Sequence, residues 1–208
     1  MTTASRTPTP PPPRPSEGEP AWDVAKLFPN QGTWSVGEYL ELNGNRLVEF
    51  SNGYIEVLTM PTMRHQLIVM FLCDVLREFL KDRVAARVLV APFRIRLWPE
   101  KYREPDVMLM LPQHADRMGN EYWDGADLVM EVVSDDDRRR DLETKRFEYA
   151  RAGIAEYWIV DPQRDTITVL KLDGTSYTVH GEFAAGARAA SALLSGFSVA
   201  VDEVFAAR

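Results

Sequence analysis

Two carboxylates in apolar surroundings are the residues of this sequence best suited to chemistry. Glu131 lies inside the apolar run 128–133, and Asp106 follows Pro105 and precedes the apolar run 107–111. Runs of this kind are normally covered on both faces, where an ionised carboxylate is costly unless it is paired or binds a metal. Two carboxylates at the same level of neighbouring strands would form a hard oxygen site suited to Mg²⁺ or Mn²⁺.

Each carboxylate also has a simpler explanation. Glu131 could face water from an edge strand, and Asp106 could bond a turn at the entry of its strand. Taken one at a time, neither residue decides between a structural role and a metal site. The hypothesis of a site therefore rests on the pair.

A helix expected after Glu131 carries further polar candidates. Asp141, Lys145 and Tyr149 are spaced i, i+4 and i+8, so they lie along one face of that helix. If this face looks inward, Lys145 points toward the strand of Glu131, where an ammonium can orient water and stabilise charge on a phosphate. The alternative is an ordinary surface pair between Asp141 and Lys145.

Three consecutive arginines, Arg138 to Arg140, stand at the start of the same helix. They could hold the phosphates of a substrate. They could equally form a solvated face that offsets the acidic residues 135–137.

The chain is expected to alternate hairpin, helix and strands. The pattern predicts these elements: a short helix 33–40 capped by Thr33, a hairpin 46–51 and 54–59 around Asn52-Gly53, a long helix 62–82, strands 87–97, 106–111 and 127–134, a helix of about 16 residues capped by Ser134 with Asp137 and ended by Gly153, a strand 156–160, an antiparallel pair 166–171 and 176–180, and a last strand near 197 with a helix from 202. This order favours an α/β (α+β) fold, with a mixed central sheet flanked by helices. The hairpin and the antiparallel pair extend it at the two ends.

Composition describes a globular domain with an unusual first segment. Residues 1–20 are rich in proline and are expected to form a disordered tail, which leaves residues 21–208 as the domain. The single cysteine, Cys73, excludes an intramolecular disulfide and fits a reducing compartment. No apolar run is long enough to span a membrane, so we expect a cytoplasmic protein. The net charge of −7 argues against a broad basic surface, although a bound metal would reverse the charge locally.

Three stretches, 104–107, 128–134 and 156–162, together with Asp141, Lys145, Tyr149 and Gly153, resemble the Uma-two family of restriction-endonuclease-like proteins. This family belongs to the PD-(D/E)XK nuclease superfamily, and the resemblance runs from about Trp34 to Phe205. It implies a restriction-endonuclease-like mixed sheet with an aspartate and a glutamate on adjacent strands. Asp106 and Glu131 match these residues, which bind Mg²⁺ (or Mn²⁺) and so activate water for phosphodiester hydrolysis.

One position departs from the superfamily pattern. The superfamily usually has lysine two residues after the glutamate, where this chain has Val133. The resemblance therefore makes Lys145, on the following helix, the candidate for that role.

Two upstream residues also match the family. Glu49 fits an acidic residue ahead of the hairpin glycine and could bind a metal or position a ligand. It lies opposite Glu56 across the hairpin, however, and two facing carboxylates are unfavourable unless they reach water or a cation. His65 fits a histidine that could act on a proton or touch a phosphate. Its alternative is a hydrogen-bonded core histidine.

The resemblance implies a metal-dependent endonuclease with double-stranded DNA as its default substrate. Asp106, Glu131 and Glu49 would hold the metal, Lys145 would position water, and His65 and Asp141 would assist. A homodimer would allow two copies to cut two strands. The alternative is a catalytically inactive nuclease-fold module for binding or assembly, which Val133 and the acidic net charge favour. A metal-dependent hydrolase of small phosphoesters is a third class.

Overall fold

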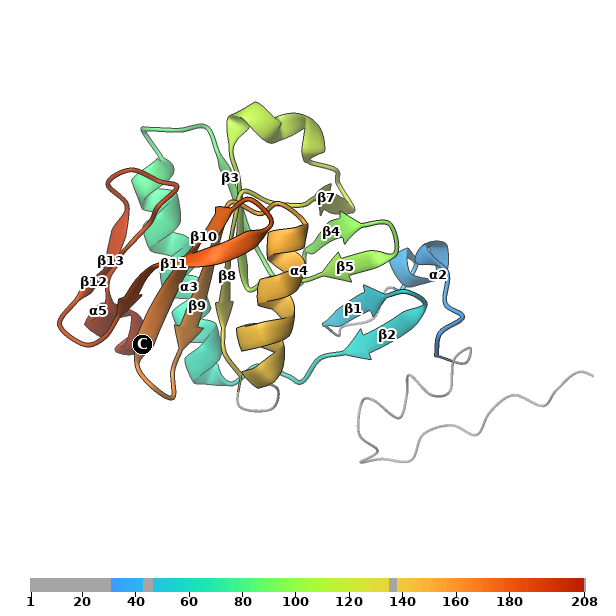
Figure 1. Ribbon diagram of the computed structural model, residues 1–208, viewed down its shortest axis with the longest axis horizontal. Coiled ribbons are helices and arrows are strands. Elements are labelled where there is room, and N and C mark those ends of the chain that lie inside the picture. Colours follow the sequence, from blue (N-terminus) through green and yellow to red (C-terminus); the bar gives the residue numbers. More distant parts are fainter. Residues whose placement is uncertain (1–30, 43–46, 135–137, 208) are drawn as a thin grey trace, which may run out of the picture.

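The computed structural model describes residues 31–42, 47–134 and 138–207 (Figure 1). In these ranges the helices are α2 (Val36–Leu40), α3 (Met63–Leu80), α4 (Lys145–Arg151) and α5 (Val201–Phe205), with a 3-10 helix at Pro112–Arg117 and a π-helical turn at Arg140–Thr144. The strands are β1 (Val48–Ser51), β2 (Tyr54–Val57), β3 (Arg87–Val90), β4 (Arg94–Trp98), β5 (Lys101–Arg103), β6 (Val107–Met110), β7 (Tyr122–Asp124), β8 (Leu128–Val132), β9 (Glu156–Asp161), β10 (Thr166–Asp173), β11 (Ser176–Phe183), β12 (Arg188–Ala190) and β13 (Ser198–Ala200).

These strands form two larger sheets and a small one. The central sheet has the order β11-β10-β9-β8-β6-β3, and only its β8–β9 pair is parallel among the pairings described. The second sheet has the order β2-β1-β5-β4-β7, and β12 pairs with β13. The predicted mixed central sheet, N-terminal hairpin and C-terminal antiparallel extension are therefore present.

Helices cover both faces of the central sheet. Both faces are apolar, because alternate side chains of its strands point to opposite sides. On one face, α3 packs over a core that includes Val107, Leu109, Leu128, Met130 and Val132. On the other face, α4 packs over a second core that includes Met108, Met110, Val129, Val133 and Ile159. Successive side chains of a strand point to opposite faces, so Glu131 belongs to the face covered by α4.

The long helix α3 begins and packs as its sequence predicts. Its N-cap is Thr62, whose side chain accepts a hydrogen bond from the backbone N–H of His65 at 3.2 Å. Ile68, Leu72 and Leu76 repeat at helical spacing and are buried. This start places His65 in the first turn, at the end of the helix that lies beside Asp106. No helix in the described ranges has the length and apolar character needed to cross a membrane.

The hairpin is confirmed with the predicted register. Asn52 and Gly53 form its turn with positive φ values of 48° and 82°. Glu49 pairs with Glu56, so the two carboxylates face each other as expected. The sheet must therefore supply a cation at this point.

The prediction of a single strand over 87–97 is wrong. Pro92 interrupts it, and the chain forms β3 and β4, which belong to different sheets. Proline has no N–H for a sheet ladder, which is why the pairing stops there. The chain thus crosses between the sheets at Ala91-Pro92.

The ends of the predicted helices are only partly as expected. Thr33 does not cap the first helix, since Ser35 does so in a capping box with Glu38. The capping box predicted with Asp137 lies outside the described residues. Gly153 follows α4 with a φ of 78°, as predicted for a helix end.

We expect Leu72→Ala to lower the free energy of unfolding by about 2–5 kcal/mol, because it leaves a cavity under α3. Urea denaturation followed by circular dichroism measures this change. Met70→Ala is the matched control, since Met70 is half exposed on the same helix. An equal loss in both variants would contradict the packing described.

Candidate active site

Strands β6 and β8 bring the two predicted carboxylates together. They are antiparallel with Val107 opposite Met130, and one further residue along that register places Asp106 beside Glu131. Both side chains belong to the face of the sheet that α4 covers, since Asp106 alternates with Met108 and Glu131 with Val129 and Val133. The backbone N–H of Val132 donates to Asp106 Oδ2 at 2.8 Å, which fixes the orientation of that carboxylate. The candidate pair is thus held by the sheet itself.

The helix after β8 supplies the other three groups. Lys145 Nζ lies 2.8 Å from Glu131 Oε2 and 3.1 Å from Asp141 Oδ1. The hydroxyl of Tyr149 donates to Glu131 Oε1 at 2.5 Å. The side chains of Glu131, Asp141, Lys145 and Tyr149 are all buried. Lys145 therefore points inward to the acidic pair, and the surface-pair alternative for Asp141 and Lys145 is wrong.

His65 reaches the site from α3. Its Nε2 lies 3.2 Å from Asp106 Oδ2. Its Nδ1 is buried and has no hydrogen-bond partner within the described part of the chain. His65 thus lies beside Asp106, while its predicted role on a proton or a phosphate stays a prediction.

The charges of the site perturb one another. Burial raises the pKa of Glu131 to about 7; Lys145 opposes this rise, while Asp106 and Asp141 add to it. For Lys145, burial disfavours the ammonium, but Glu131 and Asp141 outweigh it and raise its pKa. The pKa of His65 is also raised, because Asp106 and Glu131 together outweigh the effect of burial. The site is rich in negative charge that cations compensate.

These groups surround one cavity of about 500 Å³. Its lining includes Asp106, Glu131, Asp141, Lys145, His65 and Arg140. Thr59, Met60 and Pro61, from the segment between β2 and α3, line it too. Five of the six residues proposed from the sequence as site residues therefore share one cavity.

Glu49, the sixth, lies next to this cavity in a buried network of charges. Its Oε2 contacts Arg103 Nη1 at 2.6 Å and also contacts Arg140 Nη2, and its Oε1 accepts from the N–H of Glu104 at 3.1 Å. Arg103 also contacts Glu56 at 2.7 Å. Arg103 is thus the cation that the facing pair Glu49 and Glu56 requires.

The network continues into α4. Glu148 lies 2.8 Å from Arg103 Nε and 2.6 Å from Lys101 Nζ. Burial raises the pKa of the Glu148 carboxyl, but Arg103 and Lys101 outweigh it, so the net shift is downward. The side chains of β5 therefore join the hairpin to the helix that carries Lys145.

Sequence reasoning missed Arg103, Lys101 and Glu148 as parts of this region. One signal was available, since Glu49 opposite Glu56 requires a cation. The partner could not be identified, because β5 is a three-residue strand of charged and aromatic residues without an apolar pattern.

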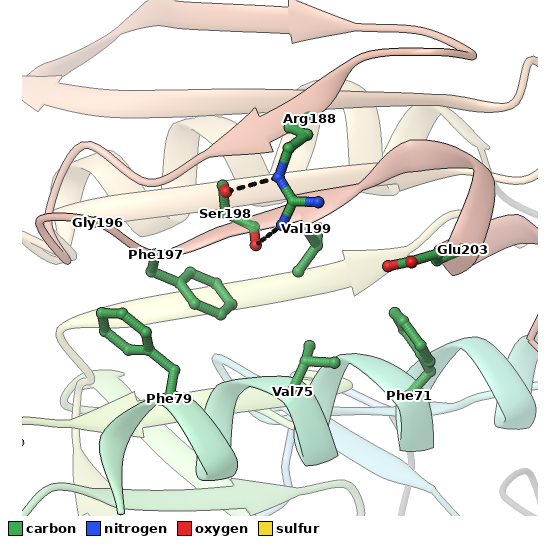
Figure 2. A pocket seen from close by; sticks show the side chains of 9 residues that line it. All are labelled: Phe71, Val75, Phe79, Arg188, Gly196, Phe197, Ser198, Val199 and Glu203. Atoms are coloured by element: carbon green, nitrogen blue, oxygen red, sulfur yellow. Dashed lines mark hydrogen bonds between the residues drawn. The ribbon is translucent and has the colours of Figure 1, made fainter. Parts of the chain in front are cut away.

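A second, smaller cavity of about 190 Å³ lies elsewhere, between α3 and the β12–β13 region (Figure 2). Figure 2 shows the rings of Phe71, Phe79 and Phe197 at its wall. Its arginine, Arg188, donates to the side chain and backbone oxygens of Ser198. This cavity holds no pair of carboxylates and none of the predicted site residues.

The donor chemistry of the larger cavity fits a magnesium ion. Asp106, Glu131 and Asp141 place three carboxyl groups around the ammonium of Lys145, and carboxyl oxygens are the hard donors that Mg²⁺ takes. Within the described ranges, no group of three His, Cys, Asp or Glu side chains is arranged as a metal cluster. Mg²⁺ commonly takes only one or two carboxylates and completes its shell with water and phosphate.

Comparison with known proteins identifies the family and the fold of this chain. The Uma2 family model, described as "Putative restriction endonuclease", matches residues 36–202. A crystal structure described as "a putative nuclease belonging to DUF820", from Anabaena variabilis ATCC 29413, aligns over 83% of this chain and 98% of its own length. The TM-score is 0.68 at 19% identity, which shows a shared fold. No curated protein matches this chain significantly. The predicted nuclease-type fold and the family resemblance are confirmed.

We expect Arg103→Ala to lower the free energy of unfolding by about 3–5 kcal/mol, because it leaves buried carboxylates without their cation. Arg64→Ala is the control, since Arg64 forms an exposed pair with Asp165 and should cost no more than about 1 kcal/mol. Thermal and urea unfolding compare the two variants. A loss for Arg103→Ala as small as that of the control would contradict the network.

Proposed function

We propose, from the premise that this chain belongs to the Uma2 family, that it is a metal-dependent endonuclease that hydrolyses phosphodiester bonds of DNA. The observation that carries the proposal is the contact of Lys145 Nζ with Glu131 beside Asp106, in a cavity. The usual lysine position holds Val133, and Lys145 supplies an ammonium at the same carboxylate. The missing lysine therefore does not leave the site without a cation.

Asp106 and Glu131 are the residues that would hold Mg²⁺ or Mn²⁺. A bound divalent ion supplies an activated water and charge neutralisation for phosphodiester hydrolysis. Its charge would offset the negative excess of the cavity.

Lys145 holds the reacting water or a phosphate oxygen with its ammonium group. Glu131 and Asp141 form ion pairs with Nζ and so hold it at the cavity. An ammonium in buried surroundings stabilises the charge that grows on the phosphate during attack.

Tyr149 and His65 position the carboxylates. The Tyr149 hydroxyl donates to Glu131, and His65 Nε2 contacts Asp106, so each acid has one neighbour that orients it. Because Glu49 does not line the cavity and is bound to Arg103 and Arg140 beside it, we propose the positioning role for it, rather than direct metal binding.

Double-stranded DNA is the substrate that we propose by analogy with restriction endonucleases, and a homodimer would cut its two strands. The net charge of −7 predicts weak or metal-dependent binding rather than tight binding. A reducing, cytoplasmic setting agrees with the buried free cysteine.

We expect wild-type protein with Mg²⁺ or Mn²⁺ to cleave plasmid DNA and oligonucleotides. Asp106→Asn and Lys145→Met should each slow cleavage by at least about 100-fold, because each removes one group of the reacting centre. Gel electrophoresis of timed reactions measures the rates. The matched controls are Asp116→Asn and Lys171→Met, which change exposed residues in the same way.

Three outcomes decide this proposal. Full activity of the controls with loss in Asp106→Asn and Lys145→Met supports it. Equal cleavage by all the proteins indicates a contaminant or another site. No cleavage by any protein, with DNA binding retained, favours the nuclease-fold binding module.

We also expect Mg²⁺ or Mn²⁺ to stabilise the folded protein, because a ligand of the native state shifts unfolding by mass action, by about 2.7 kcal/mol at 100 times its dissociation constant. Differential scanning fluorimetry with and without the ion measures this without any cleavage. Asp106→Asn should lose the shift, and Asp116→Asn should keep it. An equal shift in both variants would place the metal elsewhere.

A further inference from the structure

The three consecutive arginines have three different environments. Arg138 pairs with the buried carboxylate of Asp161 at 2.5 Å. The side chain of Arg139 is 83% exposed and pairs with Glu143 on the surface. The side chain of Arg140 is only 16% exposed and lines the cavity that holds Asp106, Glu131 and Lys145. The structure thus separates a single basic run into one surface residue, one structural residue and one cavity residue.

Consecutive residues of a helix point in different directions, since an α-helix turns by about 100° per residue. A π-helical turn follows the three arginines. The backbone N–H of Lys145 donates to the carbonyl oxygen of Arg140, an i to i+5 bond that is one residue wider than an α-helical turn. This wider turn stacks Arg140 next to Lys145 along the helix, whereas Asp141 and Lys145 still pair at i, i+4. Arg140, Asp141 and Lys145 therefore all reach the same cavity.

Two carboxylates of the hairpin hold Arg140 in place. Its Nη2 contacts Glu49 and lies 3.0 Å from Glu56. Both acids are themselves held by Arg103, which is almost fully buried. A guanidinium held by two carboxylates, of which Glu49 is buried, keeps one orientation and loses little entropy when a further anion binds.

The cavity needs such a group. A phosphodiester entering it would meet several carboxylates, and each cation of its wall, Arg140 included, already contacts a carboxylate. Arg140 differs from Lys145 because a guanidinium carries five N–H donors and an ammonium carries three. Lys145 contacts Glu131 and Asp141, His65 contacts Asp106, and Arg64 pairs with Asp165 at the exposed rim. Guanidinium is also the side chain whose geometry best matches two oxygens of one phosphate.

We propose that Arg140 is a phosphate-binding residue of this site, which contacts a non-bridging oxygen of the phosphodiester, and that Glu49 and Glu56 position it. This inference rests on the proposed nuclease function. It adds a cation that neither the acidic pair nor Lys145 provides.

Salt dependence of DNA binding tests the assignment without cleavage. A fluorescein-labelled DNA duplex is titrated with the full-length protein at several salt concentrations, in separate series with Ca²⁺ and with EDTA, and fluorescence anisotropy gives the affinity. We expect Arg140→Gln to weaken binding about 10- to 100-fold, because one charged hydrogen bond is lost. The slope of log affinity against log salt should fall by about 0.9, the value for one phosphate contact on a duplex.

Arg139→Gln is the matched control, since it removes the same charge from the adjacent exposed position. We expect it to change affinity by less than about fivefold, as surface charges do. Equal effects of the two variants, or an unchanged slope in Arg140→Gln, would overturn the assignment. So would the absence of DNA binding by wild-type protein in both series.

Thermal unfolding checks that the variants are folded. If Arg140→Gln does not fold, Arg140→Lys carries the test, because it keeps the charge but loses the planar fork. We then expect an unchanged salt slope with weaker binding, and binding equal to wild type would overturn the proposal. Binding that depends on Arg140 without cleavage would refute the nuclease and leave the phosphate contact intact. Cleavage that is independent of Arg140 would support the nuclease and refute the phosphate contact.

Discussion

The guanidinium of Arg103 is 2% exposed and contacts carboxylates from three different segments. Glu49 and Glu56 belong to the hairpin, and Glu148 belongs to the helix that carries Lys145. A buried charge must be compensated by partners at short distance, since the protein interior does not screen it. This requirement forces the second sheet, the hairpin and α4 into one fixed arrangement. The cavity and its catalytic candidates depend on that arrangement.

The charged groups fall into two sets with different balances. Lys101, Arg103 and Arg140 face Glu49, Glu56 and Glu148, which gives three positive and three negative charges. The adjoining set is unbalanced, with carboxylates in excess over the ammonium of Lys145. A balanced set is suited to support structure. An unbalanced set is suited to attract a cation.

Local backbone geometry decides which side chains reach the unbalanced set. The alternation of β8 turns Glu131 away from α3 and toward α4, while its apolar neighbours fill the core on the other side. The π-helical turn then brings Lys145 and Arg140 to the same cavity from successive turns. Lys145 thus places an ammonium beside Glu131 from a neighbouring element, in a chain that has Val133 where the superfamily usually has lysine.

Several elements of the fold could be predicted from the sequence. Asn52-Gly53 predicts the hairpin, the spacing from Ile68 to Leu76 predicts α3, and the apolar runs around Asp106 and Glu131 predict central strands. Such signals are local, because turn chemistry and side-chain periodicity depend on neighbours within a few residues. The resemblance to the family also depended on short stretches of this kind. Pro92 shows the limit even of local reading, since a single residue without an N–H sent one apparent strand into two sheets.

Contacts between distant residues required the folded chain. Arg103 contacts Glu49 and Glu148 across separations of about 50 residues. The sequence of its three-residue strand does not predict those partners. Whether Lys145 pairs on the surface or points at Glu131 depends on how α4 packs on the sheet. Likewise, which of three adjacent arginines enters the cavity depends on how this part of the chain packs against the hairpin. Spacing along the chain supplied the candidates, and burial among partners from other segments selected among them.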